Sequence, residues 1–400
     1  MNKIIKYKLK PFRSVTIDEY KSIKNLFVTG KLSGFLAGNN KEFYGGKNVL
    51  NFEKKINNYF NVKYSITVNS WTSGLIIALK AMDLKKNDEV ILPAWTMSAC
   101  LAAILINGLK PVFCDINEDN FTLCVNDLKK KITKKTKAII AVDLFGACCE
   151  YDKIFEITKK RNIKILSDSA QAIGAKYKKR YTSTFTDIGG FSLNRHKHIN
   201  TGEGGIIVTN NKKYAYRCAL LRNHGENTVI DKDPKLRKMM GYNLRLGEIE
   251  AKIGIQQLKK LKKIIIRRKQ NCKKIYLGLA NLDGLIIPNK NYIKQSIFYY
   301  LPFKIDNTKI VNNKEYIINQ LKKTGLQGLE VYYPQLNRLP YFKKKEIQKC
   351  PVSERINKNS FFALKVCSYE YDSRDVELII KCFKKVWKKL KYKNVTKKKT

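Results

Sequence analysis

The amino-acid sequence predicts an α/β protein with a mostly parallel central sheet in a large domain, followed by a smaller C-terminal α+β domain. Between residues 64 and 209, short β-rich runs alternate with helical patterns, which is typical of βαβ units on a buried sheet. Lysine-rich helical sequence over residues 247–279 comes next, and a different pattern follows from about residue 286 to residue 392. With 44% hydrophobic residues, the chain of 400 residues can form a sizeable core.

Two helices are expected before the sheet, over residues 17–27 and 49–59, because apolar residues recur there near helical spacing. A Gly-rich segment over residues 30–46 separates them. The expected strands are residues 65–68, 89–92, 111–114, 138–142, 163–166 and 205–209. We expect an N-terminal arm and the large domain over residues 1–260, the small domain over 261–393 and a flexible basic tail over 394–400.

The chain is strongly basic, with 79 Lys+Arg against 33 Asp+Glu and a formal net charge of +46. Such a surplus can mark a nucleic-acid-binding surface. Here the excess is nearly all lysine, is spread along the chain and accompanies abundant asparagine and isoleucine, as in a compositionally biased source. Because no basic stripe is interleaved with stacking aromatic residues, we do not expect nucleic-acid binding.

The cysteines and histidines indicate neither a disulfide framework nor a metal site. The ten cysteines are scattered without a Cys-x-x-Cys pair, and there are only three histidines. The longest apolar run, residues 99–109, is too short to span a membrane, and the N-terminus has no signal-peptide pattern. We therefore expect a cytoplasmic protein with reduced thiols and no membrane insertion.

The most informative stretch is Ser192 to Gly205, which places Lys197 between a serine and a Gly-rich turn. It follows a buried-strand run that leads to Asp168. A lysine amine that can form a Schiff base, a hydroxyl for a phosphate and a carboxylate for a pyridine nitrogen are what pyridoxal phosphate requires. Taken singly, Lys197 reads as a surface charge and Asp168 as the N-cap of the next helix.

Other candidate residues also follow expected strands, where ligands bind in open α/β sheets. Ser70, Thr72 and Ser73 open a helix, whose free N–H groups and dipole favour a phosphate; an ordinary N-cap without ligand is the alternative. Ser192 would add a hydroxyl. Trp95 offers a flat face that suits stacking on a pyridinium ring, although a tryptophan at a strand end can equally be a core residue.

Six motifs together resemble the DegT/DnrJ/StrS family of pyridoxal-phosphate sugar aminotransferases, which have the fold-type I aspartate aminotransferase architecture. The resemblance covers about residues 17–381 and rests on residues 68–75, 93–96, 168–175, 192–205, 241–245 and 350–355. It implies that Lys197 links the cofactor covalently and later shuttles a proton, and that Asp168 keeps the ring nitrogen protonated. It also implies that Gln171 supports the ring or its phenolic oxygen.

The resemblance makes Asn243 a phosphate contact contributed by the other subunit, so a homodimer with shared active sites is expected. Arg245 is the candidate contact for a substrate carboxylate or phosphate, by resemblance and by its bidentate chemistry; a structural ion pair is the alternative. The retained Lys197 argues against the dehydratase branch of the family, in which histidine takes its place.

Several positions depart from the family pattern and leave the substrate open. Trp71 stands where glycine or alanine is common, Arg195 and His196 replace a small or proline-containing pair, and Asp143 replaces a frequent histidine. Residues 335–337 replace a segment that commonly contains histidine, and the 30–46 segment is longer than expected.

The expected activity is transfer of an amino group from an amino acid, expected to be glutamate, to a keto-sugar, expected to be nucleotide-linked, in amino-sugar and surface-polysaccharide biosynthesis. One alternative keeps the cofactor and changes the acceptor to a cyclitol or an aromatic precursor. Another is a non-catalytic regulatory protein of the same fold, which the three retained cofactor residues disfavour.

Overall fold

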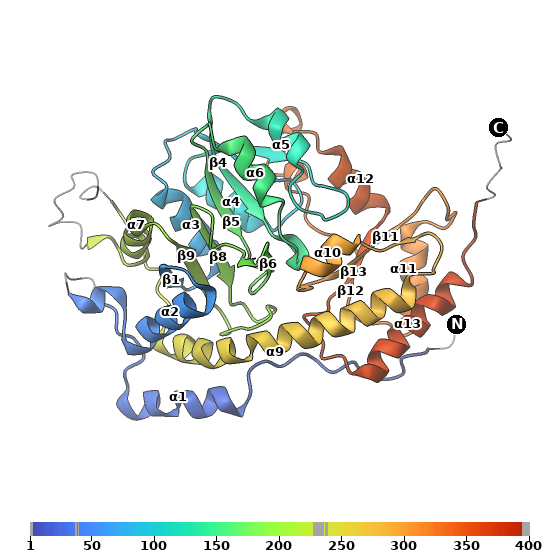
Figure 1. Cartoon of the computed structure of the whole chain (residues 1–400), viewed down its shortest axis with the longest axis horizontal. Coiled ribbons are helices and arrows are strands. Elements are labelled where there is room, and N and C mark those ends of the chain that lie inside the picture. The colour runs from blue at the N-terminus through green and yellow to red at the C-terminus, as the bar shows by residue number, and fades with distance from the viewer. Residues whose placement is uncertain (1–2, 37, 39, 227–235, 237–238, 394–400) are drawn as a thin grey trace.

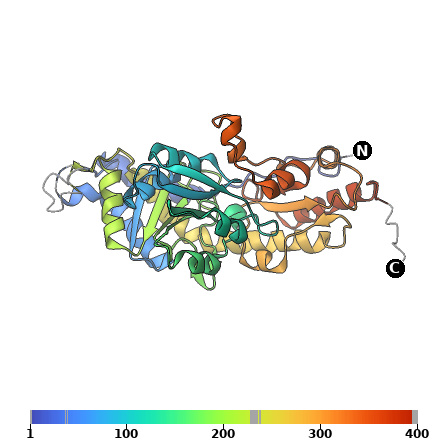
Figure 2. The same cartoon turned by 90° about the horizontal axis from the view of Figure 1, so that it is seen from above.

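The computed structural model describes residues 3–36, 38, 40–226, 236 and 239–393, so the predicted tail over 394–400 lies outside the described residues. A large α/β part and a smaller α+β part are joined by one long helix, α9 (Glu248–Leu279) (Figure 1). Seen from above, the two parts lie end to end (Figure 2). The division at residue 260 stays a prediction, and α9 runs through that position without a break.

The large part is built on a seven-stranded sheet with the order β1-β9-β8-β5-β4-β2-β3. The last five strands of that order pair in parallel, whereas β9 is antiparallel to both its neighbours, which makes the sheet mostly parallel as predicted. The strands are β1 (Tyr64–Val68), β2 (Glu89–Pro93), β3 (Lys110–Cys114), β4 (Thr136–Val142), β5 (Lys164–Asp168), β8 (Ile188–Ser192) and β9 (Gly205–Thr209).

All six strands expected from the apolar runs are present, and the sequence missed only β8 within this sheet. Its sequence, Ile-Gly-Gly-Phe-Ser, contains two glycines, which weaken the β signal. Gly190 is required by close packing, because a Cβ built there would lie 2.0 Å from a ring carbon of Trp71. Gly190, which weakens the β signal of this strand, therefore provides the space that the Trp71 indole occupies.

Helices cover both faces of the sheet. Alternate residues of β9 enter opposite layers: Ile207 packs in the core beside α3, α4 and α7, whereas Ile206 and Val208 pack in the core beside α2 and α9. A third cluster lies under α5 and α6. These helices are α2 (Lys47–Phe60), α3 (Trp71–Ala81), α4 (Ser98–Ile106), α5 (Val125–Lys131), α6 (Tyr151–Thr158) and α7 (Lys212–Arg222).

The long helix α9 also anchors the N-terminal elements. The predicted helix at residues 17–27 is α1 (Ile17–Thr29), which packs along α9 (Figure 1). The first residue of α9, Glu248, accepts hydrogen bonds from the backbone N–H groups of Asn48 (2.9 Å) and Val49 (3.0 Å). It thereby caps α2, whose own N-cap, Gly46, has no side chain.

The smaller part contains a four-stranded antiparallel sheet with the order β10-β11-β13-β12, as expected of an α+β domain. Its strands are β10 (Leu285–Ile286), β11 (Leu301–Ile305), β12 (Leu329–Glu330) and β13 (Phe361–Leu364), and its helices are α10 (Lys290–Gln295), α11 (Lys314–Lys323), α12 (Pro351–Asn359) and α13 (Ser373–Trp387). A separate hairpin in the large part pairs β6 (Lys176–Tyr177) with β7 (Arg180–Tyr181). None of the helices in the described ranges is long and apolar enough to cross a bilayer.

A fully buried carboxylate, Asp143, follows β4. It accepts hydrogen bonds from the hydroxyls of Tyr151 (3.0 Å), Ser169 (2.6 Å) and Thr182, and from the backbone N–H of Cys149 (2.9 Å). Burial raises the pKa of Asp143 from 3.8 to about 6, although these donors favour the charged form. The folded protein therefore binds this proton more tightly than the unfolded chain does.

We expect the Asp143→Asn variant to change the pH dependence of stability. A raised carboxyl pKa stabilises the fold below the unfolded value, and this contribution is lost as pH rises through the folded value of about 6. The free energy of unfolding of the wild type, relative to the variant, should fall by about 3 kcal/mol between pH 3.5 and pH 7. Urea unfolding of both proteins across this range measures it, and parallel profiles would contradict the assignment.

Candidate active site

The predicted cofactor residues lie at the carboxyl ends of the parallel strands. Asp168 is the last residue of β5 and Ser192 the last of β8. Strand β1 runs in the same direction as β8, because β9 is antiparallel to both, and Ser70 follows it at the start of α3. Three separated stretches of sequence are thus brought to one edge of the sheet.

The Asp168 carboxylate is the most constrained group at this edge. It is 4% exposed, and its Oδ1 accepts hydrogen bonds from the indole N–H of Trp71 (2.7 Å) and the backbone N–H of Ala170 (3.0 Å). Its Oδ2 accepts a hydrogen bond from the thiol of Cys100, with 3.1 Å between the sulfur and the oxygen. The N-cap alternative for Asp168 is not realised, because the next helix after it is α7, which begins only at Lys212. The bond from Ala170 lies in a turn, and the two side-chain donors fix the carboxylate further.

Lys197 lies on the turn that connects β8 to β9. Its backbone N–H donates to the carbonyl of Asn194 (2.9 Å), and its Nζ lies 4.7 Å from the ring centroid of Tyr299. Desolvation lowers the pKa of the amine, and the negative charge of Asp168 opposes this effect. A lowered pKa increases the neutral fraction of the amine, which is the form that can attack a carbonyl.

The predicted phosphate residues surround the N-terminus of α3. Ser70 is the N-cap, and its Oγ accepts from the backbone N–H of Ser73 (3.1 Å). Thr72 is exposed, whereas Ser73 and Ser192 are buried. The ordinary N-cap of the alternative interpretation is therefore present, and the roles of these four residues toward a phosphate stay predictions.

Gln171 connects the two parts of the protein. Its Oε1 accepts from the backbone N–H of Phe145 (2.8 Å), and its Nε2 donates to the hydroxyl of Tyr333 (2.6 Å). Trp95 also bonds to this tyrosine, through its indole N–H and the Tyr333 carbonyl (3.1 Å). The Trp95 side chain is fully buried and stands edge-on to Phe145, Tyr333 and Phe361. The stacking of Trp95 on a cofactor stays a prediction. Its complete burial among these aromatic rings favours the alternative, in which Trp95 is a core residue.

Asn243 and Arg245 lie together on the segment before α9. Asn243 is exposed, and its Oδ1 accepts a hydrogen bond from the Nε of Arg245 (2.8 Å). The Nη1 of Arg245 donates to the Oδ1 of Asn223 (3.4 Å), so two amide oxygens hold this guanidinium. An exposed Asn243 is compatible with a contact to a second subunit, and both roles remain predictions.

Sequence reasoning missed three residues of the site. Cys100 reaches Asp168 from α4, Tyr333 reaches Gln171 from the small part, and Tyr299 lies against the Lys197 amine. No local motif marks them, since each is at least 68 residues away in sequence from the residue it contacts. The sequence marked Trp71 only as a departure from the family pattern and did not predict its hydrogen bond to Asp168.

The residues present fit pyridoxal phosphate. The buried Asp168 carboxylate suits a protonated ring nitrogen, the Lys197 amine has a lowered pKa, and the α3 N-terminus suits a phosphate.

We expect Trp71→Phe to destabilise the protein, because it leaves a buried carboxylate without one of its donors. Hydrogen bonds to charged groups contribute about 2 kcal/mol. Trp387→Phe is the matched control, since its indole N–H donates to a neutral carbonyl, that of Asp283 (3.0 Å), and should cost about 1 kcal/mol. Urea unfolding measures both, and a loss in Trp71→Phe no larger than in the control would contradict the role given to this hydrogen bond.

Comparison with known proteins agrees with this geometry. The family model described as the DegT/DnrJ/EryC1/StrS aminotransferase family matches residues 36–382. The chain is 34% identical over 309 residues to GDP-perosamine synthase of Escherichia coli O157:H7, which covers 77% of this chain and 82% of that protein. It is 28% identical over 335 residues to 3-oxo-glucose-6-phosphate:glutamate aminotransferase of Bacillus subtilis, covering 82% of this chain and 71% of that protein.

The fold is that of a solved aminotransferase from Psychrobacter cryohalolentis, with a TM-score of 0.84 at 23% identity, covering 95% of this chain and 99% of that one. The predicted fold-type I architecture is thereby confirmed. Since the family model covers most of the sequence, the chain belongs to the DegT/DnrJ/EryC1/StrS aminotransferase family, and its cofactor is pyridoxal phosphate.

Proposed function

We propose that the protein transfers the amino group of glutamate to the keto group of a nucleotide-linked sugar, in the biosynthesis of amino sugars for surface polysaccharides. Family membership supports the transamination. The name of the Escherichia coli relative supports a GDP-linked compound, and the name of the Bacillus subtilis relative supports glutamate and an oxo-sugar. Arg195 and His196, exposed beside Lys197, are candidate contacts for the charged part of such an acceptor.

The observation that carries this proposal is the Lys197 amine, with its lowered pKa, near the charge of Asp168. When bound, pyridoxal phosphate supplies an aldehyde for this amine and an aromatic ring that takes up electrons. Lys197 takes the proton from the carbon that bears the amino group and returns one in the second half of the reaction. Asp168 orients the ring and holds the proton on its nitrogen, while the α3 N-terminus and its hydroxyls bind the phosphate.

The active form is proposed to be a homodimer in which Asn243 completes the partner's phosphate site. Exposed apolar residues support a subunit interface near Asn243. Leu36 is 51% exposed, and its carbonyl accepts from the Nδ2 of Asn223, which forms a β-bridge with Asn243. Phe27 and Val28 on α1 are 62% and 81% exposed. Large exposed apolar side chains are typical of a subunit interface.

Arg245 is proposed to bind a phosphate or carboxylate of the substrate. Its guanidinium is already oriented by the amide oxygens of Asn243 and Asn223. The enzyme is also proposed to work in the cytoplasm, a location that its cysteines support. All ten are free thiols, as expected in a reducing compartment.

The first half of the reaction can be tested by mixing the cofactor-loaded protein with glutamate. We expect the absorption band of the lysine-linked cofactor to convert to that of the aminated cofactor, with one 2-oxoglutarate released per active site. Lys197→Ala should show neither the band nor the conversion. Lys212→Ala is the control, since Lys212 is an exposed lysine on α7. Conversion by the Lys197→Ala variant at the rate of the wild type would refute the assignment.

The acceptor is tested by presenting the aminated enzyme with keto-sugars linked to GDP or UDP, and with cyclitol and aromatic ketones. Return of the original absorption band and formation of an amino sugar are expected only with a nucleotide-linked sugar. Amination of a cyclitol or an aromatic precursor alone would replace the proposed acceptor while keeping the transaminase.

Sharing of the active site predicts complementation between two inactive variants. Lys197→Ala removes the reacting amine, and Asn243→Asp places a negative charge against the partner's phosphate. In a mixed dimer one site carries both changes and the other carries neither, so about a quarter of the wild-type activity should return after equal mixing and exchange. Activity assays of the mixture against each parent measure this, and no recovery despite demonstrated subunit exchange would contradict shared sites.

A further inference from the structure

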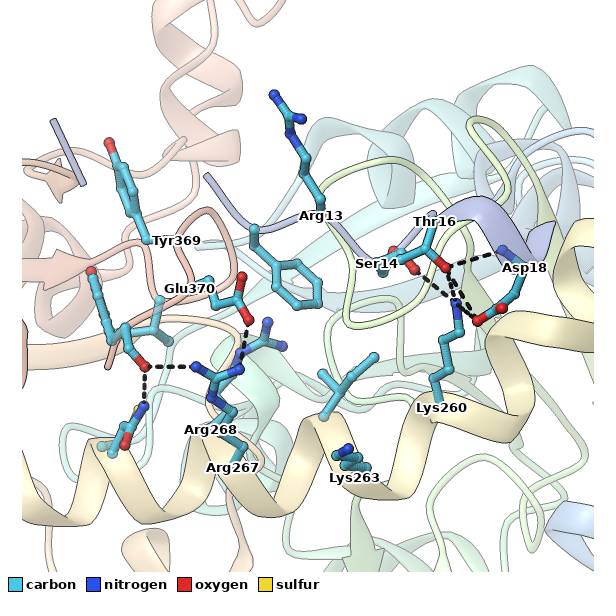
Figure 3. Close-up of a pocket in the computed structure, with 16 residues that line it drawn as sticks. Arg13, Ser14, Thr16, Asp18, Lys260, Lys263, Arg267, Arg268, Tyr369 and Glu370 are labelled. Carbon is cyan, nitrogen blue, oxygen red and sulfur yellow. Dashed lines mark hydrogen bonds and ion pairs between the residues drawn. The ribbon is translucent and has the colours of Figure 1, made fainter. Parts of the chain in front are cut away.

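A pocket of about 370 Å³ has none of the predicted cofactor residues in its lining (Figure 3). Its walls are the N-terminal segment from Phe12 to Asp18, the middle of α9, and the segment from Val366 to Tyr371. Five of its residues are cationic and two are acidic; the cations are Arg13, Lys260, Lys263, Arg267 and Arg268, and the acids are Asp18 and Glu370.

Both acids and two of the five cations in the pocket form ion pairs. Lys260 lies 2.8 Å from the carboxylate of Glu19 and 3.4 Å from that of Asp18. Arg267 lies 2.6 Å from the carboxylate of Glu370 (Figure 3). The acids in the pocket are therefore committed to neighbouring cations, and they do not neutralise the rest of its positive charge.

Arg268 is the one buried cation of the pocket, whereas Arg13 and Lys263 are exposed. The residue is 7% exposed, and its Nη1 is buried without a hydrogen-bond partner. Within the part of the chain that the structure describes, no carboxylate pairs with this guanidinium. A buried charge without an anionic partner is costly, because it loses its hydration. The Arg268 guanidinium is therefore suited to bind an anion.

An aromatic ring packs against the Arg268 guanidinium. The guanidinium carbon lies 4.9 Å from the ring centroid of Phe12, a stacking contact between a cation and an aromatic face. Phe12 is held in place by its backbone N–H, which donates to the carbonyl of Ser368 (2.9 Å). Tyr371, which also lines the pocket, is 5% exposed, and its hydroxyl is buried without a hydrogen-bond partner. Two of the residues that line the pocket thus each carry a buried polar atom without a hydrogen-bond partner.

We propose that this pocket binds a small organic anion, with its phosphate or carboxylate on Arg268 and its apolar body against Phe12. The planar fork of an arginine matches two oxygens of either group.

This site adjoins the residues that follow the reacting lysine. The positive charge of Arg268 contributes, after burial, to holding the pKa of His198 well below its usual value. His198 is fully buried, and its Nε2 contacts the carbonyl of Ile297 (3.1 Å). An anion bound to Arg268 would reduce the electrostatic effect of this arginine on His198. Because His198 is next to Lys197 in the chain, binding in the pocket would change the electrostatics of the loop that carries Lys197.

The test uses calorimetric titration of the protein loaded with pyridoxal phosphate, so that the cofactor site is filled. Phenyl phosphate and benzoate are the probes, and inorganic phosphate tests whether the apolar body matters. We expect at least one organic probe to bind at one site per chain, more tightly than inorganic phosphate. Arg268→Met should weaken this binding about tenfold or more, because a charge-assisted contact is lost. Phe12→Ala should weaken it several-fold.

Lys262→Ala is the matched control, since Lys262 is an exposed lysine on the same helix and does not line the pocket. If Arg268→Met does not fold, as judged by circular dichroism, Arg268→Lys replaces it; this variant keeps the charge but loses the planar fork and should also bind more weakly. Unchanged affinity in a folded Arg268 variant, or no binding of either organic probe up to about 10 mM, would overturn the proposal. Equally tight binding of inorganic phosphate would overturn the role of the apolar wall.

Discussion

The site depends on one buried carboxylate, that of Asp168, at the end of a strand in the middle of the sheet. A carboxylate at 4% exposure is stable only where donors replace its hydration. Those donors come from two different helices, Trp71 at the start of α3 and Cys100 on α4. The position of β5 between β8 and β4 allows these helices to meet over the carboxylate, and Gly190 on β8 leaves the space that the indole fills.

The second constraint is the junction between the two parts. Gln171 at the large sheet bonds to the Tyr333 hydroxyl, and the backbone N–H of Tyr299 donates to the carbonyl of Phe145 (2.9 Å). Both tyrosines come after α9, so this helix must place the small part correctly for the Lys197 amine to be covered (Figure 1). Desolvation of the amine, and hence its lowered pKa, is therefore a product of the whole arrangement.

The sequence was sufficient where the signal is local. Apolar runs predicted six strands of the main sheet, and the spacing of Asp168, Ser192 and Lys197 predicted the cofactor. Sequence reasoning failed where a residue acts through a partner that is distant in the sequence. Cys100 reads as one of many scattered thiols, and the glycines of β8 conceal a central strand. The unpaired state of Arg268 could not be predicted from a chain with 79 lysines and arginines, because only packing shows which charges lack partners.

Lys197 is proposed to be the one lysine that reacts with the cofactor. The most direct test of this proposal is reduction of the loaded protein with borohydride, followed by proteolysis and mass spectrometry to find which lysine carries the reduced cofactor. We expect a single modified peptide containing Lys197, at about one cofactor per chain. Modification of another lysine in place of Lys197, or no stable attachment to any lysine, would contradict it.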